Sequence, residues 1–152
     1  MNKKKLQIEQ LEAKMKVFSS CGKVAAPPTG WIKAVRLSLG MSLQQMANKL
    51  SVTRQSAGDI EKREMEGSIT LKALKEAANA LDTDVVYGLV PKDGSLDRLI
   101  ERKAKRLAIE IVKRTSSSME LEDQVNTEKR LRKAVTERTA SLKNEMPKIL
   151  WD

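Results

Sequence analysis

Residues 41–63 read MSLQQMANKLSVTRQSAGDIEKR, and this stretch predicts two short helices joined by a tight turn. Apolar residues recur at helical spacing in its first half, at Leu43, Met46, Ala47 and Leu50. Ser42 supplies the hydroxyl that an N-cap needs, and Thr53 can cap the second helix in the same way. Ala57 and Ile60 then face inward, with Val52 close to the corner between the helices. The pattern favours packed helices and therefore a mainly α fold.

The remaining positions of the second helix are small, polar or basic, as in a helix that enters the DNA major groove. Ala47 is small enough to let two helices cross closely. This ordered set is typical of a helix-turn-helix with residues 53–62 as the recognition helix. The alternative is an ordinary helical hairpin in a core, because helix pairs with polar outer faces are common.

A recognition helix reads base edges from its first residues, and nearby polar or basic side chains contact phosphates. We expect base contacts from Thr53, Arg54, Gln55 and Ser56, with Gly58 and Asp59 at the rim. We expect phosphate contacts from Lys33, Arg36, Ser42, Gln44, Lys49, Lys62 and Arg63. Glu61, Glu64 and Glu66 are interpreted as solvated or helix-end charges.

The charge distribution supports a nucleic-acid partner. The 152 residues carry a formal charge of +9, and residues 33–63 hold six basic side chains against two acidic ones. With no histidine and one cysteine, Cys21, the chain lacks zinc-finger spacing and histidine catalysis, and no nucleotide-binding loop is present. We expect no enzyme activity, no metal and no cofactor. No apolar run approaches membrane-spanning length, so we expect a cytoplasmic, nucleoid-associated protein with no membrane contact.

Three regions are expected: a helical arm and linker over 1–26, the helix-turn-helix domain over 27–91, and a helical extension over 92–152. In the arm, one helical stripe is formed by Ile8, Leu11, Met15 and Phe18. It packs either on the C-terminal helices or on a second subunit. The domain begins with a helix that Gly40 ends, with Trp31 as a core anchor. A further helix, capped by Thr70, completes it.

Residues 84–90 predict one short strand, built from Val85, Val86, Tyr87, Gly88, Leu89 and Val90. A lone strand leaves its backbone groups unpaired, and the sequence holds no second candidate strand. The same strand of a second copy is the simplest mate, which predicts a homodimer.

Two helical stretches follow, over 96–111 and 119–146, and Pro147 stops the second. The apolar tail 149–151 needs a cover, either from these helices or from another chain.

The helix-turn-helix resembles the Xre/lambda-repressor family, whose members read DNA as dimers. The whole chain is most similar to the "mobile mystery protein A" family through residues 27–91, SSMELEDQ (117–124) and LWD (150–152). Proteins of that family are encoded beside a Fic-domain protein, so the resemblance implies an autoregulatory antitoxin acting on a palindromic operator. Residues 70–92 are also similar to antitoxins of the Hip persistence type, in which a strand pairs across the dimer.

Two departures from these families matter. Many members have Gln after the capping Ser, where this chain has Leu43, and Gln44 is the nearer substitute. Fic antitoxins often carry an inhibitory helix, [S/T]-x-x-x-E-[G/N]. The nearest strings here run from Ser118 to Asp123 and from Ser141 to Met146, and both lack the closing Gly or Asn. The alternative function is a protein-interaction module that neutralises a partner without specific DNA binding.

Overall fold

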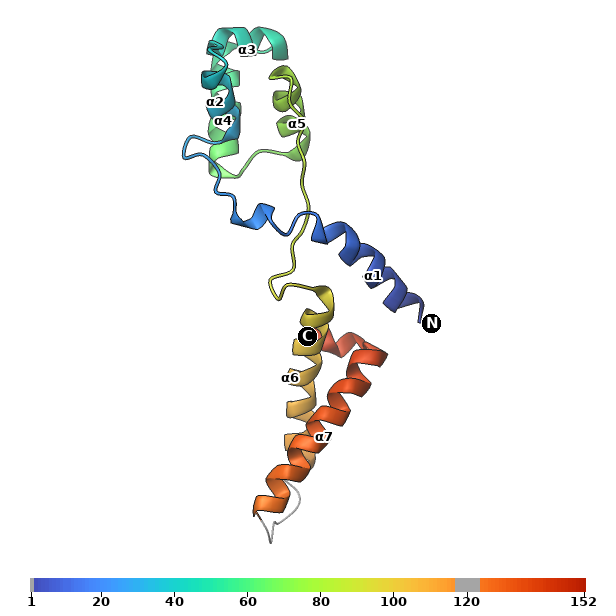
Figure 1. Ribbon diagram of the computed structural model, residues 1–152. Coiled ribbons are helices and arrows are strands. Elements are labelled where there is room, and N and C mark those ends of the chain that lie inside the picture. The colour runs from blue at the N-terminus through green and yellow to red at the C-terminus, as the bar shows by residue number, and fades with distance from the viewer. Residues whose placement is uncertain (1, 117–123) are drawn as a thin grey trace. The chain divides into compact units, whose positions relative to one another are not determined.

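The computed structural model describes residues 2–116 and 124–152, and it is mainly helical, as predicted (Figure 1). The chain divides into two compact units. One unit is Ser20–Gly88, and the other combines Met1–Ser19 with Leu89–Asp152. Each unit is built on its own aliphatic core.

The unit Ser20–Gly88 holds four α-helices preceded by a short 3₁₀ turn, η1 (Cys21–Lys23). The helices are α2 (Trp31–Ser38), α3 (Leu43–Leu50), α4 (Arg54–Glu66) and α5 (Leu71–Ala80). All three predicted N-caps are confirmed: Ser42, Thr53 and Thr70 each accept a hydrogen bond from the backbone N–H three residues on. Gly40 follows α2 with φ of +67°, as a residue that ends a helix should.

The core of this unit is aliphatic and follows the predicted helical stripes. It is formed by Ile32, Met46, Ala47, Ala57, Ala77 and Leu81. Leu43, Leu50, Ile60 and Leu74 pack around them. The predicted role of Trp31 as a core anchor is wrong, because its side chain is 50% exposed. It is the first residue of the short helix α2, and Ile32 beside it is the residue that enters the core.

No strand is found in the residues that the structure describes, so the predicted strand over 84–90 is not observed. Residues 83–91 instead form an extended connection. A strand requires a hydrogen-bonded neighbour, and one chain offers this segment none. Val86, Tyr87, Leu89 and Val90 remain exposed.

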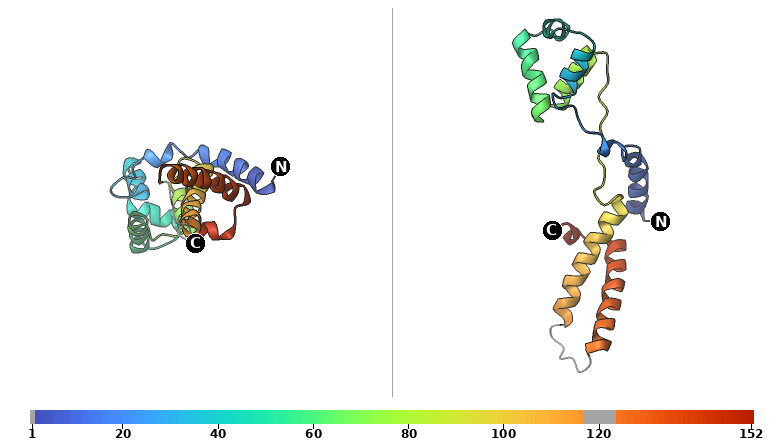
Figure 2. Two further views of the ribbon diagram at one scale, coloured as in Figure 1. Left: turned by 90° about the horizontal axis from the view of Figure 1, so that it is seen from below. Right: turned by 60° about the vertical axis from the view of Figure 1, so that its left-hand side comes forward.

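The second unit is a helical hairpin with the N-terminal helix packed against it. α6 (Leu96–Ser116) and α7 (Gln124–Glu145) run side by side in opposite directions (Figure 2). Their shared core contains Ile100, Ala104, Ala108 and Leu142. The C-terminal 3₁₀ turn, η2 (Lys148–Trp151), inserts Leu150 into this core, so the chain's own helices cover the centre of its apolar tail. Of residues 117–124 (SSMELEDQ), which carried part of the family resemblance, all but Gln124 lie outside the described residues.

The N-terminal helix α1 (Lys3–Lys16) belongs to this same unit. Ile8 packs against its core, and Glu12 Oε1 accepts a hydrogen bond of 2.8 Å from the backbone N–H of Asp97, in the first turn of α6. Lys143 of α7 also contacts the first turn of α6, with its Nζ 2.9 Å from Asp97 Oδ2. This hydrogen bond raises the pKa of the Lys143 ammonium. The arm therefore packs on the C-terminal helices, the first of the two arrangements that the stripe allowed.

Within the described part of the chain, no helix combines the length and the apolar character needed to cross a membrane. No group of three or more His, Cys, Asp or Glu residues able to hold a metal ion occurs there either.

Candidate nucleic-acid interface

A tight turn joins α3 and α4, and a side chain caps the N-terminus of each helix. At the start of α3, Ser42 and Gln45 form a reciprocal capping box, with bonds of 3.1 Å and 2.8 Å. Ser51, the residue that follows α3, has the left-handed backbone conformation, with φ of +55°. Two residues later Thr53 Oγ1 accepts from the N–H of Ser56 at 3.1 Å and starts α4. The turn is thus held by local hydrogen bonds.

Small residues set the approach of the two helices. Ala47 of α3 and Ala57 of α4 are completely buried. A Cβ placed on Gly58 would lie 3.6 Å from Leu43 Cδ2, so this position faces α3 as well as the open surface. Leu43 itself packs against the core, while Gln44 and Gln45 beside it in the first turn of α3 are exposed. Here Gln44 Nε2 donates to Asn48 Oδ1 at 2.9 Å.

The start of α4 presents polar side chains at its surface. Arg54, Gln55 and Asp59 are exposed, and Ser56 is half-buried. Thr53 Oγ1 donates to Ser56 Oγ at 2.9 Å, so the threonine hydroxyl uses its proton and one of its two acceptor positions within the cap. The long side chains of Arg54 and Gln55 are therefore the best placed of the predicted base-contacting residues to reach outward.

Most of the predicted phosphate-contacting residues also lie at the surface, namely Lys33, Ser42, Gln44, Lys49, Lys62 and Arg63. Lys62 makes one long i,i+4 ion pair with Glu66, at 3.9 Å. Both side chains are largely exposed, so such a pair contributes little and is easily exchanged for another anion.

Arg36 is the exception, because it lies inside the domain. Its guanidinium forms a two-point ion pair with Glu61, with Nε 2.5 Å from Oε1 and Nη2 3.3 Å from Oε2. Nη1 donates to the backbone carbonyl of Met41 at 2.9 Å. Each side chain of the pair is only 8% exposed. The predicted phosphate contact by Arg36 conflicts with this geometry, and the interpretation of Glu61 as a solvated charge is wrong.

Sequence spacing carried a signal for this pair. Arg36 lies four residues after the buried Ile32, and Glu61 lies four residues after the buried Ala57. Residues four apart share a helix face, so both charges are on the inner faces of their helices. Opposite charges at inward positions of two helices favour a buried ion pair over two solvated groups.

Glu64 also turns inward. Its Oε1 accepts a hydrogen bond of 2.9 Å from the backbone N–H of Trp31 and so caps α2 from the last turn of α4. Its Oε2 is buried beside Gly30, whose φ of +85° brings the backbone close. The positive end of the α2 dipole favours a carboxylate at this place. Glu61 and Glu64 thus orient α4 against α2, while Arg54 and Gln55 remain outside.

The comparison with known families agrees with this geometry. Residues 32–87 match the family model described as Helix-turn-helix, of the Xre/lambda-repressor type. The matched segment runs from α2 through α5, and it defines a helix-turn-helix domain of DNA-binding transcription regulators. Comparison of the chain with curated proteins and with solved structures found no match.

Proposed function

We propose that this protein is a sequence-specific transcriptional repressor that binds double-stranded DNA through α4. The observation that carries the proposal is the exposure of Arg54 and Gln55 at the capped start of that helix. Arg can bond guanine O6 and N7 together, and Gln can bond adenine N6 and N7. The exposed cations Lys49, Lys62 and Arg63 flank these residues along the chain and supply charge for phosphate contacts. The proposed role is binding without catalysis.

The proposed active form is a homodimer on a palindromic operator. Val86, Tyr87 and Leu89 leave 76%, 61% and 79% of their surfaces exposed, in an extended segment without a sheet partner. Pairing of this segment with its copy would satisfy its backbone groups and cover these side chains. A twofold dimer would place two recognition helices about 34 Å apart, one DNA turn.

The resemblance to the "mobile mystery protein A" family extends the proposal to an autoregulatory antitoxin beside a Fic-domain protein. The string that begins at Ser118 is outside the described residues. In the other string, Ser141 Oγ donates to Glu145 Oε1 at 2.6 Å at the end of α7, and both residues precede Met146. Because the closing Gly or Asn is missing from both strings, the proposed restraint on the partner is indirect.

In vitro selection from random duplex DNA, followed by titration of the full chain on the enriched sequence, tests the repressor function. We expect a palindromic consensus and binding that weakens steeply with salt. Recovery of unenriched random sequence would contradict specific recognition. Co-expression with the Fic-domain protein that this proposal places beside the gene tests the antitoxin role separately, through rescue of growth. Rescue without any DNA selectivity would favour the alternative, a protein-interaction module.

A further inference from the structure

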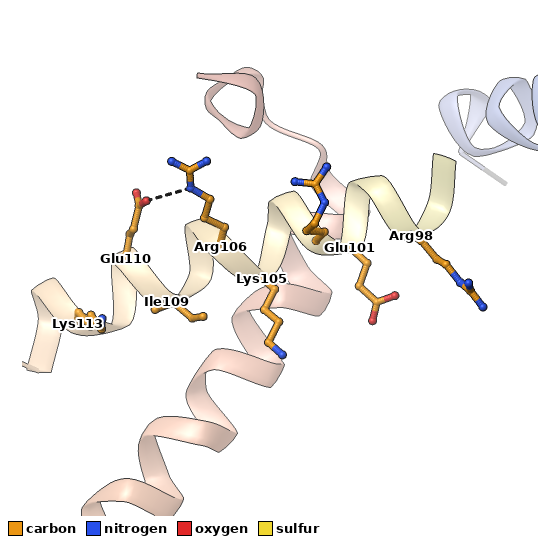
Figure 3. Close-up of a pocket in the computed structure, with 8 residues that line it drawn as sticks. Arg98, Glu101, Lys105, Arg106, Ile109, Glu110 and Lys113 are labelled. Carbon is orange, nitrogen blue, oxygen red and sulfur yellow. Dashed lines mark ion pairs between the residues drawn. The ribbon is translucent and has the colours of Figure 1, made fainter. Parts of the chain in front are cut away.

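The outer face of α6 carries a line of cations that the proposed recognition of DNA by α4 does not use. We call this line the α6 stripe, and it consists of Arg98, Arg102, Lys105, Arg106 and Lys113. Their spacing is helical, so they share one side of α6, while Ile100, Ala104 and Ala108 face α7 from the other side. Figure 3 shows stripe side chains extending from α6, with α7 passing behind it.

Only part of this charge is neutralised. Arg102 is held by Asp93 through two bonds of 2.9 Å, which also lower the pKa of the Asp93 carboxyl. Arg106 lies 3.7 Å from Glu110. Within residues 2–116 and 124–152, no ion pair involves Arg98, Lys105 or Lys113. These three cations are exposed.

Two cations of α7 are held in i,i+4 ion pairs with carboxylates of the same helix, Arg132–Glu128 and Lys133–Glu137. Lys129 and Arg130 are exposed on the same helix. On α6, the face that carries the stripe also holds Glu101 and Glu110, so five cations there stand against two carboxylates. This excess of cations on one face of α6 favours a polyanion that lies along the helix.

We propose that the α6 stripe binds the sugar–phosphate backbone of duplex DNA and adds sequence-independent affinity to the recognition by α4. This proposal rests on the proposed function, since it takes as its ligand the same DNA. From Arg98 to Lys113 the stripe covers about 22 Å along the helix axis. Duplex DNA carries one charge per roughly 1.7 Å of its own axis, so several phosphates fall within that length. Each neutralised phosphate releases counterions.

The test compares two triple variants of the full chain with the same change in net charge. The stripe variant is Arg98→Ala/Lys105→Ala/Lys113→Ala, and the control is Lys129→Ala/Arg130→Ala/Lys133→Ala on α7. Binding to a random-sequence duplex is measured across a salt series. Loss of three phosphate contacts should lower the log–log salt slope by about 2.7 units in the stripe variant. The control should keep the parent slope. Equal slopes in both variants overturn the proposal.

A charge-conserving variant, Arg98→Lys/Lys105→Arg/Lys113→Arg, tests whether positive charge at these positions is what sets the salt slope. It should retain the parent slope, and its loss of slope would contradict a simple phosphate contact. Failure of the proposed function gives a different result. In that case the selection recovers no preferred sequence, yet the stripe variant still lowers the salt slope on random DNA. If the stripe variant instead loses only the Fic-domain partner and keeps its DNA slope, the stripe is a protein-binding surface and the proposal is wrong.

Discussion

Arg36 of α2 and Glu61 of α4 form a buried two-point ion pair across the helix-turn-helix domain. Removing one partner leaves the other charge buried without compensation. We expect Arg36→Met to lower the free energy of unfolding by about 3–5 kcal/mol, as measured by urea denaturation. The double variant Arg36→Met/Glu61→Leu should recover most of this loss, because an apolar pair of similar volume needs no partner. A double variant as unstable as the single one would contradict this account.

Gly30 is expected to be required because its backbone touches the buried carboxylate of Glu64. A Cβ at this position would collide with Glu64 Oε2 and lie 3.3 Å from Met65 Cα, and the φ of +85° disfavours any side chain. Gly30→Ala should therefore destabilise the domain by about 1–3 kcal/mol or more. Thermal unfolding in a Glu64→Ala background provides the control, since the collision with the carboxylate is then absent. The same cost in both backgrounds would show that backbone strain alone is responsible.

Ser51 occupies the left-handed region at the turn between α3 and α4, with φ of +55° and an exposed side chain. Glycine adopts this conformation without a Cβ penalty. Ser51→Gly should raise the free energy of unfolding by up to about 1 kcal/mol in urea denaturation. The matched change Ser38→Gly, at a right-handed helical position in α2, should lower it by a similar amount. Destabilisation by Ser51→Gly would mean that the serine side chain matters more than the backbone conformation.

The proposed base readout predicts different effects for two exposed cations. Arg54→Ala should weaken binding to the selected operator by about 1–3 kcal/mol and affect a random duplex much less. Lys49→Ala should weaken both and lower the salt slope by about one unit, as removal of a phosphate contact does. Fluorescence anisotropy titrations on both duplexes separate these results. Equal weakening of both by Arg54→Ala would assign Arg54 to the phosphate backbone.

The proposed dimer predicts that Val86 cannot be replaced by proline without loss of assembly. Proline removes a backbone donor from the paired segment, so Val86→Pro should shift the protein toward monomer and weaken binding to the palindrome. Val86→Thr keeps the donor and the β-branched shape, and it should remain dimeric. Sedimentation equilibrium at micromolar concentration measures both variants. A monomeric parent protein, or an undisturbed dimer in the proline variant, would contradict pairing through this segment.

The local elements of the helix-turn-helix could be predicted because each depends on residues close in sequence. A capping hydroxyl and its N–H partner are three positions apart, as at Ser42, Thr53 and Thr70. The inward stripes of α3, α4 and α5 follow from helical spacing, and the small Ala47 and Ala57 are completely buried in the same core. The helical fold of this domain could therefore be predicted from the sequence, and the structure places the side chains of Arg54 and Gln55 at the surface. The strand predicted over 84–90 is not observed, because strand formation depends on a hydrogen-bonded partner outside the segment.

The amino-acid sequence by itself determined which segments are helical, where they begin, and which faces are apolar, since these properties arise from neighbouring residues. Only the tertiary structure decided how individual charges are used. Arg36 and Glu61 are 25 positions apart, Trp31 and Glu64 are 33 apart, and Glu12 reaches the start of α6 across 85. Helical spacing places Arg36 and Glu61 on the inner faces of their helices, but it does not identify each as the partner of the other. Burial removes water from a charged side chain. Its role is then set by the partner that packing brings within hydrogen-bonding distance.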